Sequence, residues 1–147
     1  MVFDPQAPPP RRSGFIRWYE EQTQWNEGHS YDRPEITTST LRAWYEEMRK
    51  DYPALNGPGS TDDVDNPKVT DYSIGKSAIY AAFAWSESKA ARDAVFRLAE
   101  KHRVGFFDVS DDNGAVWVPT ASGSYVCIHG HGAQTHSEKK WRHFRRK

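Results

Sequence analysis

The chain has 147 residues, which fits a single domain, and its 20 Lys and Arg balance its 20 Asp and Glu. Its one cysteine excludes an intramolecular disulfide bond, and its longest apolar run, residues 78–85, is too short to cross a bilayer. A mean hydropathy of -0.87 is typical of disordered chains, but 14% of the residues are aromatic, and buried rings can supply a compact core.

The N-terminal third predicts a flexible arm and two amphipathic helices. Residues 1–12 are proline-rich and are expected to be extended and flexible. Ser13 can cap a first helix, whose apolar face carries Phe15, Trp18 and Trp25 at helical spacing. A second helix begins within Thr37–Thr40 and ends at Pro53. Both helices present aromatic faces, so we expect them to share one core as an αα-hairpin.

The middle of the chain predicts a loop followed by a strand-helix-strand unit. Residues 56–70 combine glycine and proline breakers with several aspartates, as in a long surface loop. A short strand is expected over 72–75 and a buried strand over 78–85. A helix with strict apolar periodicity follows, and then a strand over 104–109. Such a unit crosses over into parallel pairing, and a turn at Asn113-Gly114 then returns the chain as an antiparallel strand.

These elements predict an α/β (α+β) fold: two N-terminal helices followed by ββαββ, with a small mixed sheet and the helices mainly on one face. We expect residues 13–119 to form the single domain. Residues 120–147 are expected to be a flexible, basic, His-containing tail. The three tryptophans on periodic faces are expected to be core residues, namely Trp18, Trp44 and Trp85.

The basic tail suggests nucleic-acid binding as an alternative function. Residues 119–147 contain six Lys and Arg against one Glu, a net charge of +5, and the remaining 118 residues contain 14 against 19, a net charge of -5. Cations interleaved with aromatic rings can neutralise phosphates and stack on bases. The candidate residues are Lys139, Lys140, Trp141, Arg142, Arg145 and Arg146.

The same region contains the only cysteine beside two histidines. Cys127, His129 and His131 alternate, which would place all three side chains on one face of a strand, and these side chains suit zinc. Their spacing does not match the usual structural zinc sites, and no second pair of ligands follows. We therefore expect no metal and no cofactor.

No motif indicates a catalytic centre. Gly75-Lys76-Ser77 lacks the upstream glycine of a phosphate-binding loop and precedes a strand, where such a loop needs a helix N-terminus. A small enzyme remains an alternative, and it requires Asp71, Asp108 and His102 to lie together. Scattered positions of these three side chains would contradict it.

One stretch resembles a known class of proteins. Residues 98–110 read LAEKHRVGFFDVS, and a short strand ending at Pro119 follows. This pattern, within residues 69–119, is similar to that of small bacterial immunity proteins associated with polymorphic or secreted antibacterial toxins. The resemblance implies a non-catalytic protein that binds a cognate toxin and blocks it. The proline-rich start is unlike a signal peptide, so we expect it to act in the cytoplasm, with no membrane partner.

The expected toxin-binding surface follows from charge and aromatic content. Acidic residues attract basic partners, and exposed rings make strong contacts when they fill a partner's pockets. The candidates are the acidic loop and neighbouring rings, namely Asp62, Asp63, Asp65, Tyr72 and Tyr31. The oligomeric state does not follow from the sequence.

Overall fold

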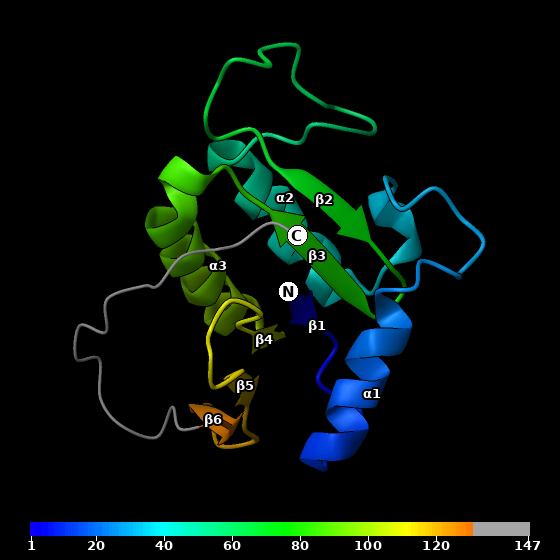
Figure 1. Ribbon diagram of the computed structural model, residues 1–147, viewed down its shortest axis with the longest axis vertical. Coiled ribbons are helices and arrows are strands. Elements are labelled where there is room, and N and C mark those ends of the chain that lie inside the picture. The colour runs from blue at the N-terminus through cyan, green and yellow to red at the C-terminus, as the bar shows by residue number, and fades with distance from the viewer. Residues whose placement is uncertain (131–147) are drawn as a thin grey trace.

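The computed structural model describes residues 1–130, which form one mixed α and β fold (Figure 1). The helices are α1 (Arg12–Gln22), α2 (Ser39–Asp51) and α3 (Ser88–His102), with short 3-10 turns at Pro34–Ile36 and Trp85–Glu87. The strands are β1 (Val2–Phe3), β2 (Asp71–Ile74), β3 (Ala78–Ala82), β4 (Gly105–Phe107), β5 (Val116–Pro119) and β6 (Tyr125–His129). No described helix combines the length and apolarity needed to cross a membrane.

The sheet has six strands in the order β2-β3-β1-β4-β5-β6, and every neighbouring pair is antiparallel. The predicted mixed sheet is therefore wrong. The strands β3 and β4, joined through α3, do run parallel to each other, but β1 lies between them and bonds to both. The predicted crossover is present without the predicted pairing.

The start of the chain lies at the centre of this sheet. Val2 pairs with Ile79 on one side and with Phe106 on the other, and both Val2 and Phe3 are fully buried. The predicted flexible arm over residues 1–12 is therefore wrong at its beginning. The order of elements starts with a strand, and this strand joins segments that are far apart in sequence.

The helices cover both faces of the sheet. On one face, α2 and α3 pack against Val2, Ile79 and Phe106. On the other face, α1 packs Phe15 and Trp18 against strand residues that include Phe3. The predicted αα-hairpin of α1 and α2 is therefore wrong, because the sheet separates these helices.

The predicted helix cap is confirmed, whereas the predictions for the tryptophans and for the tail are only partly correct. Thr38 caps α2 by accepting from the N–H of Leu41, as expected from the Thr37–Thr40 segment. Trp18 and Trp44 are buried, but Trp85 is 53% exposed, because β3 ends at Ala82 and a 3-10 turn carries its ring outward. The expected tail over 120–147 begins with an ordered strand, β6.

Candidate functional site

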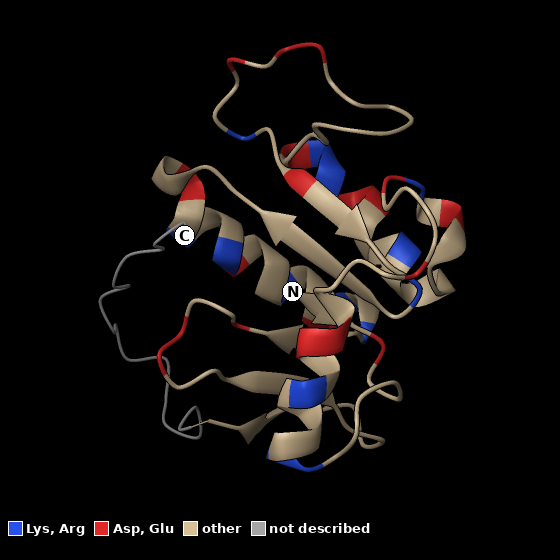
Figure 2. Cartoon of the chain, turned by 45° about the vertical axis from the view of Figure 1, so that its right-hand side comes forward, with Lys and Arg blue, Asp and Glu red and all other residues tan. Residues whose placement is uncertain are grey.

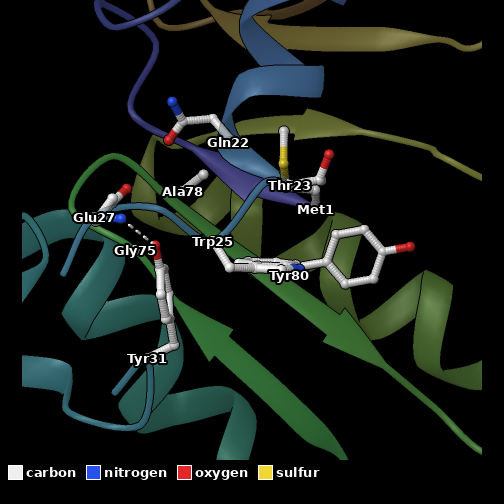
Figure 3. Close-up of a pocket in the computed structure, with 9 residues that line it drawn as sticks. All are labelled: Met1, Gln22, Thr23, Trp25, Glu27, Tyr31, Gly75, Ala78 and Tyr80. Carbon is white, nitrogen blue, oxygen red and sulfur yellow. Dashed lines mark hydrogen bonds between the residues drawn. The ribbon is translucent and has the colours of Figure 1, made fainter. Parts of the chain in front are cut away.

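An aromatic pocket lies where α1 ends beside the start of β3. Trp25, Tyr31 and Tyr80 form its walls, and Glu27 lies at its edge. The pocket is shallow and opens to solvent. Figure 3 shows the indole of Trp25 between the other two rings. We call these four residues the Trp25 pocket.

Left-handed backbone holds two of the walls in place. Trp25 has φ 57° and Tyr31 has φ 59°, a region that bulky side chains rarely adopt. Each such residue costs on the order of 1–3 kcal/mol, and such costs cluster at ligand clamps and other functional sites. Trp25 is nevertheless 43% exposed, so this conformation presents the ring to solvent instead of burying it.

Hydrogen bonds lock the loop between these two residues. The N–H of Glu27 donates to the Tyr31 hydroxyl at 2.7 Å, and the N–H of Tyr31 donates to Nδ1 of His29 at 3.1 Å. His29 Nε2 lies 2.7 Å from Oε2 of Glu27, and the N–H of Lys76 donates to the same oxygen at 2.9 Å. The loop is thereby tied to the β2–β3 turn.

Beside the pocket, Tyr19 of α1 interacts with Tyr80 of β3. Burial, and after it the neighbouring Tyr80 hydroxyl, raises the pKa of Tyr19 to about 12. Tyr19 therefore stays neutral across the physiological range. Its ring packs edge-on against Phe107 at 4.9 Å, so the tyrosine pair links the pocket to the core.

The predicted acidic residues lie on an exposed loop. Asp62, Asp63 and Asp65 are all exposed, and Val64 between them is 69% exposed. Figure 1 shows this loop standing out beyond β2 and α2, and Figure 2 shows acidic segments at its outer end. Its base is fixed, since the buried Thr70 exchanges backbone hydrogen bonds with residues 53–55.

The acidic loop contacts the loop that carries Trp25 and Tyr31 at Gly57. Gly57 has φ +85°, and a Cβ there would overlap the backbone oxygen of Asp32, one residue after Tyr31. The two loops thus approach at a point that only glycine fits. That Asp62, Asp63, Asp65 and Tyr31 form one surface stays a prediction.

Tyr72 does not belong to that surface. It is 4% exposed, and its hydroxyl donates to the backbone oxygen of Tyr52 at 2.8 Å. Its ring packs against Tyr45 with centroids 5.1 Å apart, and burial raises its pKa. The prediction that Tyr72 binds a partner is wrong, because Tyr72 lies on the inward face of β2 and its side chain is in the core.

The Cys127 and His129 side chains lie on opposite faces of the sheet. A bulge between β5 and β6 pairs Cys127 with Trp117 but His129 with Val116, so Ile128 is the extra residue. His129 consequently lies against Phe15 of α1, while Trp117 packs on the α3 face. The predicted alternation is therefore wrong, and no cluster within residues 1–130 is arranged to hold a metal ion. His131 lies outside the described residues.

The three side chains of the enzyme alternative have separate partners. Asp108 is buried and pairs with Arg92 of α3 at 3.3 Å, whereas His102 bonds Glu47 of α2 at 2.7 Å. Arg92 and His102 are ten residues apart on α3, or about 15 Å at the helical rise. Asp71 is exposed and accepts from Asn56 at 3.3 Å. These three groups do not converge on one site.

A second cleft lies between β3 and β4, where the short β1 leaves the sheet open. It has about 500 Å³ of empty space and is lined mainly by apolar side chains, among them Trp44, Phe83 and Phe106. The Asp108 carboxylate at its edge accepts from Arg92 and, at 2.8 Å, from Ser110. Its charge is therefore compensated.

Sequence reasoning missed Trp25, Glu27 and Tyr80 as site residues. Helical periodicity assigned Trp25 to the apolar face of the first helix, but α1 ends at Gln22. The available signal was Asn26-Glu27-Gly28, a polar segment typical of a loop, directly after the ring. The tail candidates Lys139, Lys140, Trp141, Arg142, Arg145 and Arg146 lie outside the described residues.

Comparison of the chain with protein-family models, with curated proteins and with solved structures finds no match.

Proposed function

We propose that the chain is a non-catalytic protein-binding module: an immunity protein that neutralises a cognate antibacterial toxin by binding it. The observation that carries this proposal is Trp25, a 43% exposed ring held by left-handed backbone. Tryptophan is among the residues most enriched at the energetic centres of protein interfaces. A loop selected only for stability favours glycine at such a backbone position.

The charge of the described residues supports a basic partner. Residues 1–130 contain 14 Lys and Arg against 19 Asp and Glu, because the other six basic residues and Glu138 lie beyond them. Asp62, Asp63 and Asp65 concentrate part of this charge on one protruding loop. An acidic surface steers a basic protein into the complex and accelerates association.

The tip of the acidic loop also offers an apolar contact. Val64 is 69% exposed between Asp63 and Asp65. A small apolar centre with a charged rim is the common anatomy of protein interfaces. The acidic loop and the Trp25 pocket therefore supply complementary parts of one binding surface.

The test is a complex with the toxin encoded beside this gene. We expect co-expression to protect cells from the toxin, and the purified proteins to form a stable complex in size-exclusion chromatography with light scattering. Absence of both protection and complex formation would overturn the proposal.

Three variants locate the surface within that complex. Trp25→Ala is expected to weaken toxin affinity by at least about 30-fold, as for a strong interface residue. Replacing the three loop aspartates by asparagine is expected to slow association and to reduce its salt dependence. Trp85→Ala is the matched control, since Trp85 is similarly exposed at 53% but lies in the turn after β3. Equal losses for both tryptophans would argue against the Trp25 surface.

A further inference from the structure

We propose that the Trp25 pocket receives a lysine ammonium group of the bound toxin. This inference rests on the proposed function and names the chemistry that the partner must bring to one point of the interface. It follows from three features of the pocket: the arrangement of its rings, the Oε1 of Glu27 without a donor, and the lack of a Lys or Arg paired with Glu27 among residues 1–130.

The rings form walls of the kind that bind cations. Tyr31 and Tyr80 both stand almost perpendicular to the indole of Trp25, at 80° and 90°, with centroids 5.3 and 6.2 Å from it (Figure 3). A cation within about 6 Å of such a ring is attracted by its electron-rich face, most strongly by tryptophan. Because Trp25 is exposed, a side chain can reach the pocket from outside.

The carboxylate of Glu27 supplies a hydrogen-bond acceptor at the edge of this pocket. Both of its donors, His29 Nε2 and the N–H of Lys76, bond Oε2. Among residues 1–130, no donor bonds Oε1. Gly75 lies beside this oxygen, and a Cβ at that position would come within 3.0 Å of it.

His29 bonds only one of the two oxygens of Glu27. The N–H of Tyr31 donates to Nδ1 of His29, so the ring meets Oε2 of Glu27 through Nε2. Within the described part of the chain, no Lys or Arg pairs with Glu27, so its Oε1 is available to a cation that the partner brings.

The single free oxygen distinguishes lysine from arginine. A guanidinium binds a carboxylate best through two parallel hydrogen bonds, which need both oxygens. Here Oε2 is already occupied, whereas an ammonium group is compact and can donate to Oε1 alone while it contacts the rings.

The test uses the full chain with n-butylammonium, which carries the end of a lysine side chain. The indole N–H signal of Trp25, assigned with Trp25→Phe, is followed by NMR at constant ionic strength. We expect saturable shifts with a dissociation constant in the millimolar range, up to about 100 mM ligand. Methylguanidinium is expected to bind several-fold more weakly, and neutral n-butanol to cause no saturable shift.

Glu27→Gln tests the charge, since it keeps the shape of the side chain and an oxygen for His29 and Lys76. We expect it to weaken butylammonium binding about 10-fold while the rest of the spectrum keeps its folded dispersion. Glu20→Gln, at an exposed position on α1, is the matched control and should leave binding unchanged. Equal binding of butanol, unchanged binding to Glu27→Gln, or no saturable shift would each overturn the lysine assignment.

These outcomes separate the two proposals, because the titration contains no toxin. If butylammonium fails to bind while Trp25→Ala still weakens the toxin complex, the lysine assignment is wrong and the immunity function stands. If butylammonium binds but the chain neither protects cells nor forms a complex, the proposed function is wrong.

Discussion

The indole ring of Trp25 meets the ring of Tyr31 edge to face, with centroids 5.3 Å apart and planes at 80°. Both residues have left-handed backbone, and the hydrogen-bonded turn between them holds this arrangement. The contact thus combines a locally unfavourable backbone with an exposed aromatic surface. The backbone conformation costs folding free energy, whereas the exposed ring contributes to the free energy of binding. The two contributions can therefore be measured separately.

Two substitutions at Trp25 measure that backbone cost. Trp25→Gly and Trp25→Ala both remove the ring, but only glycine adopts φ 57° without strain. We expect the glycine variant to be the more stable of the two by about 1 kcal/mol in urea unfolding. The same pair at Gln24, which does not have positive φ, should show the opposite order. A more stable alanine variant at position 25 would contradict the strain argument.

A second prediction concerns the carboxylate that joins α2 to α3. Glu47 accepts from Lys101 Nζ at 2.6 Å and lies 2.7 Å from His102 Nε2. The hydrogen bonds from Lys101 and then His102 lower the pKa of Glu47 to about 2. The stability from this carboxylate is therefore present above its ordinary pKa of 4.5 and is lost as the pH falls from there towards 2.

Glu47→Gln should consequently flatten the acid branch of the stability profile. We expect wild type to lose more of its unfolding free energy than the variant between pH 4.5 and 2, measured by urea unfolding at each pH. Glu21→Gln is the matched control, because Glu21 is exposed on α1 and has no ion pair among the described residues. Parallel profiles for wild type and Glu47→Gln would show that this bridge does not stabilise the fold.

Elements with long local periodicity could be predicted from the sequence. The apolar residues of α2 and α3 repeat over more than two turns, and the structure confirms both helices. β1 could not be predicted, because Val2 and Phe3 are only two residues in a polar segment. The partners of Val2, Ile79 and Phe106, lie about 77 and 104 positions away along the chain. Strand pairing at such separations leaves no local pattern.

The candidate site was predictable only in its acidic part. Breakers and aspartates indicate an exposed loop at Asp62 and Asp63 from the sequence alone. The position of Trp25 depends on where α1 ends, and periodicity does not mark that end sharply. The separation of Cys127 from His129 depends on one bulged residue, Ile128, and a simple alternation cannot anticipate it.

The close approach of β1 to β4 gives a third prediction. Phe3 is fully buried, and a Cβ at Gly105 would overlap its ring. We expect Gly105→Ala to cost about 1–3 kcal/mol through overpacking, and Phe3→Ala to cost about 3–5 kcal/mol through the lost ring. In the double variant the two costs should not add, because removing the ring makes room for the methyl group.

The measurement is a double-mutant cycle by urea unfolding. A double variant more stable than the sum of the single effects, by at least about 1 kcal/mol, supports direct contact between the two sites. Gly123→Ala lies in an open turn with nothing within 4 Å of its Cβ, and should show no such coupling to Phe3→Ala. Strict additivity at positions 3 and 105 would contradict the central position of β1.

The last prediction concerns His129, which the bulge turns towards α1. Its ring centroid lies 6.0 Å from that of Phe15, and its buried Nε2 has no partner among the described residues. Burial, and after it the charge of Arg12, lowers the pKa of His129 below its ordinary value of 6.5. The unfolded chain therefore binds a proton more readily than the folded chain as the pH falls below 6.5.

Folding stability should consequently fall with pH in that window, and His129→Leu should remove this loss. At neutral pH, leucine removes an unpaired buried nitrogen but also the backbone hydrogen bond of the imidazole with Pro10, so we expect the variant to be about as stable as wild type there. The difference in urea-unfolding free energy should widen from pH 7 to pH 5. Cys127→Ser, on the opposite face of β6, should leave the pH dependence unchanged. A constant difference between wild type and His129→Leu would contradict the lowered pKa of His129 in the folded chain.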